Sequence, residues 1–248
     1  MYLLIFKTLF FIGLLSSALN ADITSNLEAH YTFNNTLDDA SGNGHTLSIA
    51  GGGSAAYELG QIGNAYTLNG ADNELFNSSM GLSGTTGTVS FWVKLTDSTT
   101  QSLVIMGNAA NNVTMDSFIS SATTMNAAGV NASGISILDD SWHNIVFTFN
   151  GTTNLYIDNV FVDTDTSAAT LNSYLQVGGY NNTNGLVVDG AIDNLRIYSR
   201  VLTAGDRTEL FNESTTSANA PMSPMAYLVL ILTILSIGLY KNRQVIKT

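Results

Sequence analysis

The chain has 248 residues, with 19 acidic side chains against eight lysines and arginines, and it contains no cysteine. This acidic balance excludes nucleic acid as a partner, because the protein's field repels phosphates. The lack of cysteine excludes disulfides, cysteine-bound zinc and a cysteine nucleophile. All of the acidic residues lie between Asp22 and Glu213, and the basic residues in that range are only Lys94, Arg196, Arg200 and Arg207.

Residues 1–21 have the pattern of a secretory signal peptide. Lys7 precedes an apolar run, and small residues lie near Ala21, the expected last residue before the cleavage site. The alternative is an uncleaved N-terminal anchor, although the apolar run is short for a membrane span.

Residues 22–213 are predicted to form one all-β domain. Short runs rich in Val, Ile, Thr, Phe and Tyr, such as TVSFWVKL and NIVFTF, alternate with clusters of Gly, Asn, Asp and Ser. This pattern is typical of an antiparallel sandwich or barrel. Both prolines, Pro221 and Pro224, lie outside the domain, so neither interrupts a strand.

The stretch SWHNIVFTFNGTTNLYIDNVFV, residues 141–162, predicts three consecutive antiparallel strands. Alternate residues from His143 to Phe149 would share one face. Asn150-Gly151 and Asp158-Asn159 mark the two turns. We interpret Trp142 and the histidine beside it as structural, because a Trp at a strand start usually packs against the sheet. The stretch is therefore expected to be scaffold.

The chain changes character after the last strand. Thr203 and Asp206 predict the N-terminal cap of a helix whose Leu210 and Phe211 dock on the sheet. The rest of the chain is predicted to contain a polar linker at 214–224, an apolar helix at 225–240 and a basic tail at 241–248.

The apolar helix at 225–240 allows two interpretations. At about 1.5 Å per residue it covers about 24 Å, less than a hydrocarbon core of about 30 Å. Its shortness and the basic end resemble bacterial C-terminal sorting tails of the exosortase or sortase-like kind, although no LPxTG motif is present. A plain single-pass anchor is the alternative. In both cases we expect an exported domain held at the membrane or the cell surface.

Four blocks of the body occur in an order that is typical of one family. They are LEAHYTFNNTLDDASGNG from residue 27, TVSFWVKL from residue 88, the stretch 141–162, and GAIDNLRIYSRVLTAGDRTELFNE from residue 190. Together they resemble the laminin-G-like, concanavalin A-type jelly rolls. The resemblance implies two curved antiparallel sheets packed face to face, with binding loops along one rim. Asn159 stands where the family usually has Gly, and residues 107–133 match none of its pattern.

The resemblance also implies a structural calcium ion. The ligands it suggests are Asp39 and Asn43, in the loop LDDASGNG, and Asp193, in the last strand. Such an ion would join the N-terminal loop to the C-terminal strand, and Ca²⁺ prefers about six to eight oxygen ligands, which backbone carbonyls can help to supply. The alternative is that Asp39 and Asn43 cap a turn while Asp193 pairs with Arg196.

The sequence favours binding over catalysis. Concanavalin-like glycoside hydrolases carry paired carboxylates on one strand as Glu-x-Asp-x-x-Glu, and no such triplet occurs. A Gly-x-Ser-x-Gly elbow and a His-x-x-x-His spacing are also missing from the sequence. The fold alone does not settle the function, because it serves lectins, adhesins and spacers alike.

We therefore expect a non-catalytic extracellular module that binds a polysaccharide or a glycoprotein and contacts the membrane through its C-terminal helix. A structural or adhesive surface protein without sugar binding is the alternative, and a glycoside-active enzyme is a third possibility. Among the loop aromatics, Tyr180 in VGGYNNTNG has the most lectin-like surroundings.

Overall fold

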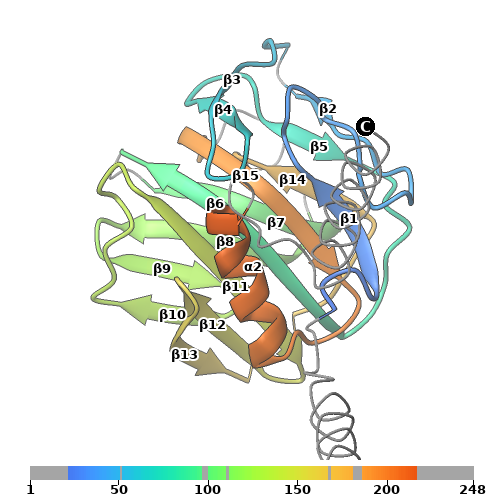
Figure 1. Ribbon diagram of the computed structural model, residues 1–248, viewed down its shortest axis with the longest axis vertical. Helices are drawn as coiled ribbons and strands as arrows, with labels where there is room; N and C mark the ends of the chain where they lie inside the picture. The colour runs from blue at the N-terminus through green and yellow to red at the C-terminus, as the bar shows by residue number, and fades with distance from the viewer. Residues whose placement is uncertain are drawn as a thin grey trace, which may run out of the picture. The chain divides into compact units, whose positions relative to one another are not determined.

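The computed structural model describes residues 22–50, 52–96, 100–109, 112–166, 169–180 and 186–216 (Figure 1). The predicted signal peptide, the apolar helix at 225–240 and the basic tail lie outside these residues. Among the residues described, no helix is both long and apolar enough to cross a membrane.

The described chain folds into two antiparallel sheets, and the larger has eight strands. Its order is β13-β12-β11-β6-β15-β4-β3, and β1 also pairs with β15. The bounds are β1 (Leu27–Tyr31), β3 (Tyr57–Leu59), β4 (Asn64–Asn69), β6 (Thr86–Leu95), β11 (Trp142–Asn150), β12 (Thr153–Ile157), β13 (Val160–Asp165) and β15 (Asp189–Tyr198).

The smaller sheet has seven strands in the order β10-β9-β8-β7-β14-β5-β2. Its strands lie between those of the larger sheet in sequence, so the chain crosses repeatedly from one sheet to the other. The bounds are β2 (Ser48–Ile49), β5 (Leu75–Asn77), β7 (Gln101–Ala109), β8 (Asn112–Ser121), β9 (Thr124–Ala127), β10 (Val130–Ser133) and β14 (Tyr174–Val177).

The hydrophobic core fills the space between the two sheets. Ile145 and Phe147 of β11 and Phe91 of β6 enter it from the larger sheet, and Met115 and Ile119 of β8 enter from the smaller one. Those on one strand are two or four positions apart, in step with the two-residue period of a strand, so alternate side chains enter the core and those between them point to the outer side of the sheet. The predicted all-β two-sheet sandwich is confirmed.

The stretch 141–162 forms the predicted meander of β11, β12 and β13. Asp158 and Asn159 have φ angles of 51° and 62°, so both adopt the left-handed conformation that a type I′ hairpin turn requires. Asn tolerates this conformation better than most residues, which explains why Asn159 can replace the glycine usual in the family.

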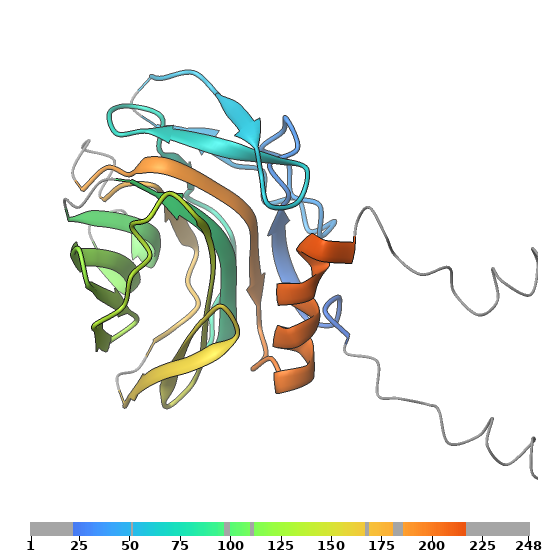
Figure 2. The same ribbon diagram turned by 60° about the vertical axis from the view of Figure 1, so that its left-hand side comes forward.

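One helix lies among the described residues, α2 (Ala204–Thr216). The predicted cap is present: Asp206 N donates to Thr203 Oγ1 at 3.2 Å, and Thr203 N donates to Asp206 Oδ2 at 2.8 Å. Phe211 stacks on Trp92 of β6 at 5.6 Å between ring centroids, and Leu210 is buried. The helix covers the outer face of the larger sheet, on the opposite side of the sandwich from β8 and β9 (Figure 2).

Candidate ligand-binding face

The outer face of the smaller sheet, which we call the open face, carries a row of polar and aromatic side chains. Along β8, Met115 and Ile119 enter the core, so by alternation Asp116 and Phe118 point away from it. Phe118 lies directly opposite Ser102 of β7 and Asn126 of β9. An aromatic ring is thus held between two polar neighbours on a rigid sheet.

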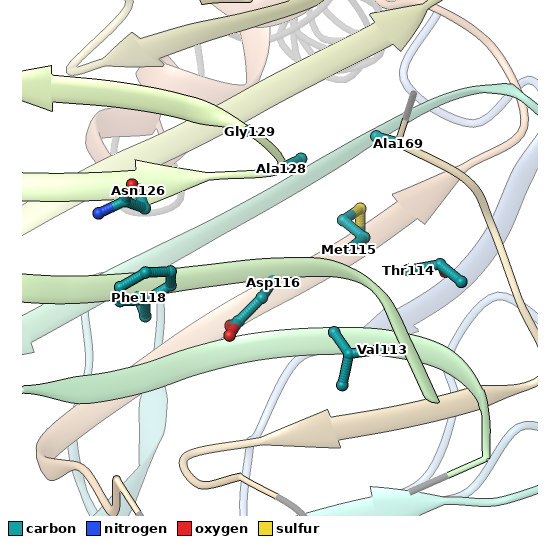
Figure 3. A pocket seen from close by; sticks show the side chains of 9 residues that line it. All are labelled: Val113, Thr114, Met115, Asp116, Phe118, Asn126, Ala128, Gly129 and Ala169. Atoms are coloured by element: carbon teal, nitrogen blue, oxygen red, sulfur yellow. The ribbon is translucent and has the colours of Figure 1, made fainter. Parts of the chain in front are cut away.

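A hollow of about 300 Å³ opens beside this row (Figure 3). Its size is at the lower end of the range of small-ligand pockets, about 300–1,000 Å³. Asp116 and Phe118 reach it from β8 and Asn126 from β9. The lining consists of Val113, Thr114, Met115, Asp116, Phe118, Asn126, Ala128, Gly129 and Ala169.

The β9–β10 turn forms one wall of the hollow. Ala128 and Gly129 have φ angles of 50° and 97°, so the turn needs two left-handed residues and Gly129 supplies one at little cost. The amide of Ala128 donates to the carbonyl oxygen of Asp116 at 2.8 Å, which fixes the turn against β8. The wall is therefore set by the backbone.

Asp116 is the acidic group of the hollow. Its Oδ1 accepts a hydrogen bond from Ser102 Oγ at 2.8 Å, while its Oδ2 accepts none from the residues described. Burial raises the pKa of Asp116 to about 6, and the hydrogen bond from Ser102 opposes that rise. At neutral pH the side chain is a carboxylate with one oxygen available to a hydroxyl donor.

The amide of Asn126 supplies a second kind of polar group. Its Nδ2 donates to Ser120 Oγ at 3.2 Å, which orients the amide along the sheet. An amide offers hydrogen-bond donors and an acceptor, so it can either donate to the oxygen of a hydroxyl group or accept its hydrogen. Phe118 adds an apolar ring surface beside these groups. A ring flanked by a carboxylate and an amide is suited to bind a small polyol.

Two of the residues predicted to bind calcium fasten a loop to β1. Asp39 accepts backbone hydrogen bonds from His30 at 2.9 Å, Ser41 at 2.9 Å and His45 at 3.1 Å. Burial raises the pKa of Asp39, but these bonds outweigh it and lower the pKa below the usual value. Asn43 Nδ2 donates to the carbonyls of Leu27 and Glu28, both at 3.0 Å. Asp39 therefore caps the turn at Ser41, and Asn43 ties the loop to β1.

The third predicted ligand, Asp193, is fully buried in β15. Its Oδ2 accepts from the amide of Ile62 at 2.8 Å, and its Oδ1 accepts from Asn194 Nδ2 at 2.9 Å. Burial raises the pKa of Asp193 to about 6 despite these bonds. A side chain at Gly60 would approach Asp193 Oδ2 to 2.6 Å, so the β3–β4 turn needs glycine there.

The alternative pairing of Asp193 with Arg196 is wrong, because Arg196 pairs with Glu213 at 2.7 Å. Over the described ranges no three His, Asp or Glu side chains are grouped to hold a metal ion. Asp39 and Asn43 also share no hydrogen bond with Asp193. Calcium at these residues stays a prediction.

Sequence patterns did not single out Asp116, Phe118 or Asn126, which lie in the region 107–133 that matches no family pattern. The signal was present in VTMDSFIS, where a carboxylate and an aromatic ring stand two residues apart and therefore share a strand face. Tyr180, the aromatic singled out from the sequence, is half-buried, and the residues that follow it at 181–185 lie outside the described part.

The sandwich and its open face define a two-sheet antiparallel jelly roll of the lectin-like class. The model of the family described as the concanavalin A-like lectin/glucanases superfamily, Laminin_G_3, matches residues 63–206. The chain belongs to this family, which confirms the resemblance seen in the sequence. None of the curated proteins matches the chain in sequence.

Solved structures share the fold. Domain 4 of AbnA, a GH43 extracellular arabinanase from Geobacillus stearothermophilus, in complex with arabinotriose, has a TM-score of 0.61 and 28% identity, covering 75% of this chain and 98% of that one. The binding domain of Paraclostridial Mosquitocidal Protein 1 has a TM-score of 0.59 and 19% identity, covering 77% of this chain and 53% of that one.

The receptor-binding domain of botulinum neurotoxin type G is also similar, with a TM-score of 0.59 and 15% identity, covering 76% of this chain and 51% of the toxin domain. This chain therefore spans about half of each of the two toxin domains. At these identities the likeness to the toxins shows the fold alone.

Proposed function

We propose that this protein is a non-catalytic carbohydrate-binding module whose ligand occupies the hollow on the open face. The observation that carries the proposal is the grouping of Phe118, Asp116 and Asn126 around that hollow. The arabinanase domain bound to arabinotriose supports it, because it has the same fold at 28% identity.

Each side chain has a distinct part in the proposed complex. The ring of Phe118 packs against the C–H face of a sugar, and such aromatic contacts contribute about 0.5–1.5 kcal/mol beyond burial. Asp116 Oδ2 accepts a sugar hydroxyl, and the amide of Asn126 binds a neighbouring one. A few contacts of this size must also offset the entropy lost on association, so we expect a Kd near the millimolar range for one sugar unit.

Binding fits the hollow better than hydrolysis. Glycosidases use two carboxyl groups, about 5–5.5 Å apart in retaining enzymes and about 6.5–9.5 Å apart in inverting ones. Asp116 is the one carboxyl group among the described lining residues. The similar arabinanase structure is domain 4 of its enzyme, and the toxin structures are binding domains.

The test is a calorimetric screen of the full-length protein against neutral oligosaccharides, arabinotriose included. We expect at least one to bind, and Phe118→Ala to weaken binding about tenfold or more, because the stacking surface is lost. Phe161→Ala is the matched control, since Phe161 is 53% exposed on β13 of the other sheet. No binding across the screen, or equal losses in the two variants, would overturn the proposal.

We further propose that the domain is exported and tethered at the membrane or cell surface. The signal-peptide pattern of residues 1–21 and the apolar segment 225–240 with its basic end support this. Fractionation of the native host followed by N-terminal sequencing tests it. A chain that retains residues 1–21 and is recovered in the cytosol would contradict it.

The structural calcium ion is a further proposal, supported by the family resemblance and by the acidic loop at Asp39. We expect the Tm of the full-length protein to be several degrees higher in calcium chloride than in EDTA, because a ligand of the folded state alone stabilises it. Equal values of Tm in the two buffers would exclude a stabilising calcium ion.

A further inference from the structure

The basic side chains of the described residues all belong to the larger sheet and its helix. Lys94 of β6 pairs with Glu58 at 2.6 Å, and Arg196 of β15 pairs with Glu213 at 2.7 Å. The other two follow the same pattern: Arg200, just after β15, pairs with Asp206, and Arg207 of α2 lies over the ring of Tyr156 at 3.8 Å. Each cation is already engaged on that side.

The smaller sheet, by contrast, is built from sequence without any cation. Between residues 95 and 195 the chain has no lysine and no arginine, and this range contains all of β7, β8, β9, β10 and β14. The two shorter strands, β2 and β5, also lack basic residues. A ligand on the open face therefore meets no positive side chain from the sheet below it.

The open face carries an acidic group in place of a cation. Asp116 lines the hollow and is the one carboxyl group among its described lining residues. Its carboxylate adds negative potential to this face, and no lysine or arginine of the smaller sheet offsets that potential.

We propose that the hollow selects uncharged sugars and rejects acidic ones, with Asp116 as the specificity-determining residue. This inference rests on the proposed carbohydrate-binding function and names its ligand class. An uncharged sugar donates a hydroxyl to Asp116 Oδ2. A uronate or sialate carboxylate in the same place would meet a like charge and lose its hydration without gaining a donor.

The test uses one oligosaccharide in two forms. A neutral hexose oligosaccharide that binds in the screen is compared by calorimetry with its uronic-acid form, in which the C6 hydroxymethyl groups are carboxylates. We expect the wild-type protein to bind the neutral form at least tenfold more tightly, which corresponds to about 1.4 kcal/mol. In Asp116→Asn the preference for the neutral form should fall to about threefold or less, because the amide does not repel the carboxylate of the uronic form.

The control is Asp163→Asn, which makes the same change in net charge on the exposed side of β13 in the other sheet. It should leave the ratio unchanged. Equal or tighter binding of the uronic form by the wild-type protein would overturn charge selection while leaving sugar binding intact. If Asp116→Asn had the same ratio of affinities for the neutral and uronic forms as the wild-type protein, Asp116 would not be the specificity-determining residue. If no sugar of either form binds, the proposed function falls together with this inference.

Discussion

The outer faces of the two sheets differ: a helix covers one, and the other carries a hollow. On the larger sheet, helix α2 covers the surface, with Phe211 stacked on Trp92 and Arg196 paired with Glu213. On the smaller sheet the outward side chains Asp116, Phe118 and Asn126 line a hollow. Both faces arise from the same alternation of strand residues, so the difference between them depends on which outward residues become neighbours across the strands.

The charged side chains are also distributed unevenly between the two faces. The cations stay with the helix-covered face, where they bind acidic side chains and aromatic rings. Asp116 on the open face has no cationic partner among the described residues. On the helix-covered face the charged side chains therefore form ion pairs, and on the open face a carboxylate stands without a cation.

The largest effect is expected from Glu213→Ala, which tests what holds the helix in place. The substitution leaves the guanidinium of Arg196, a residue only 4% exposed, without its carboxylate partner. Because Glu213 itself is about one-third exposed, we expect a loss of about 2–3 kcal/mol, near the lower end for a broken buried pair. Urea unfolding measures it.

Glu209→Ala is the control for this experiment, since Glu209 lies on the exposed side of the same helix. Sugar binding should be unchanged in both variants, because the hollow is on the other sheet. If the two variants lost equal stability, the ion pair would not be what holds the helix-covered face together.

The next effect concerns the buried side chain of Glu74. Glu74→Met removes a buried carboxyl group that has no hydrogen-bond partner among the described residues and replaces it with an apolar chain of similar size. We expect the variant to be more stable by about 1–2 kcal/mol, because the cost of burying two oxygens without hydrogen-bond partners disappears. Urea unfolding in EDTA and in calcium is the measurement. A loss of stability would show that a cation or an ordered water occupies the site.

A smaller effect, with a defined pH dependence, is expected from Asp206→Asn. Burial raises the pKa of Asp206, but hydrogen bonds from Arg200 and Thr203 outweigh it and lower the pKa to about 2. Because the folded pKa lies below the unfolded value, the stabilisation is present above about pH 4 and is lost as the pH falls toward 2. We expect the variant to lose about 1 kcal/mol at pH 7.

The difference in unfolding free energy between the wild-type protein and Asp206→Asn should disappear as the pH is lowered. Urea unfolding at several pH values measures this difference. A difference that stays constant down to pH 2 would contradict the assignment of the low pKa to Asp206. This experiment separates the capping of α2 from the ion pair between Arg196 and Glu213.

The smallest effect is expected at His143, in the meander of the larger sheet. Its ring contacts Asp158 at 2.8 Å and Asp139 at 3.1 Å. Burial lowers the pKa of His143, but the hydrogen bonds to these aspartates outweigh it and raise the pKa above 6.5. The stabilisation is therefore full below pH 6.5 and is lost as the pH rises through the folded pKa.

His143→Gln should accordingly differ from the wild-type protein in Tm more at pH 5.5 than at pH 9, with His45→Gln as the control. Because both aspartates are partly exposed, the difference should also shrink in high salt. A Tm difference larger at pH 9 than at pH 5.5 would contradict the raised pKa of His143.

Much of the fold could be predicted from the sequence because its signals are local. The run NIVFTF marks a strand, Asp158-Asn159 marks a turn that needs two left-handed residues, and Thr203 with Asp206 marks a helix start. Each depends on residues that are close together in the chain. The structure confirms all three.

The candidate site could not be predicted in the same way, because its parts come together only across strands. Asp116 and Phe118 stand on β8, Asn126 stands on the next strand, and Ser102 approaches from β7. The role of Asp193 is also non-local, since it accepts the amide of Ile62 from a turn more than a hundred residues away. Pairing register, which sequence patterns do not state, decides both contacts.

Strand periodicity, turn residues and composition can be read along the chain, and they indicate an acidic all-β sandwich or barrel without disulfides. Which outward face α2 covers, and which one holds the hollow, is visible in the folded molecule alone. Alternation sets which residues leave the core, but the order of strands in each sheet sets which of them become neighbours.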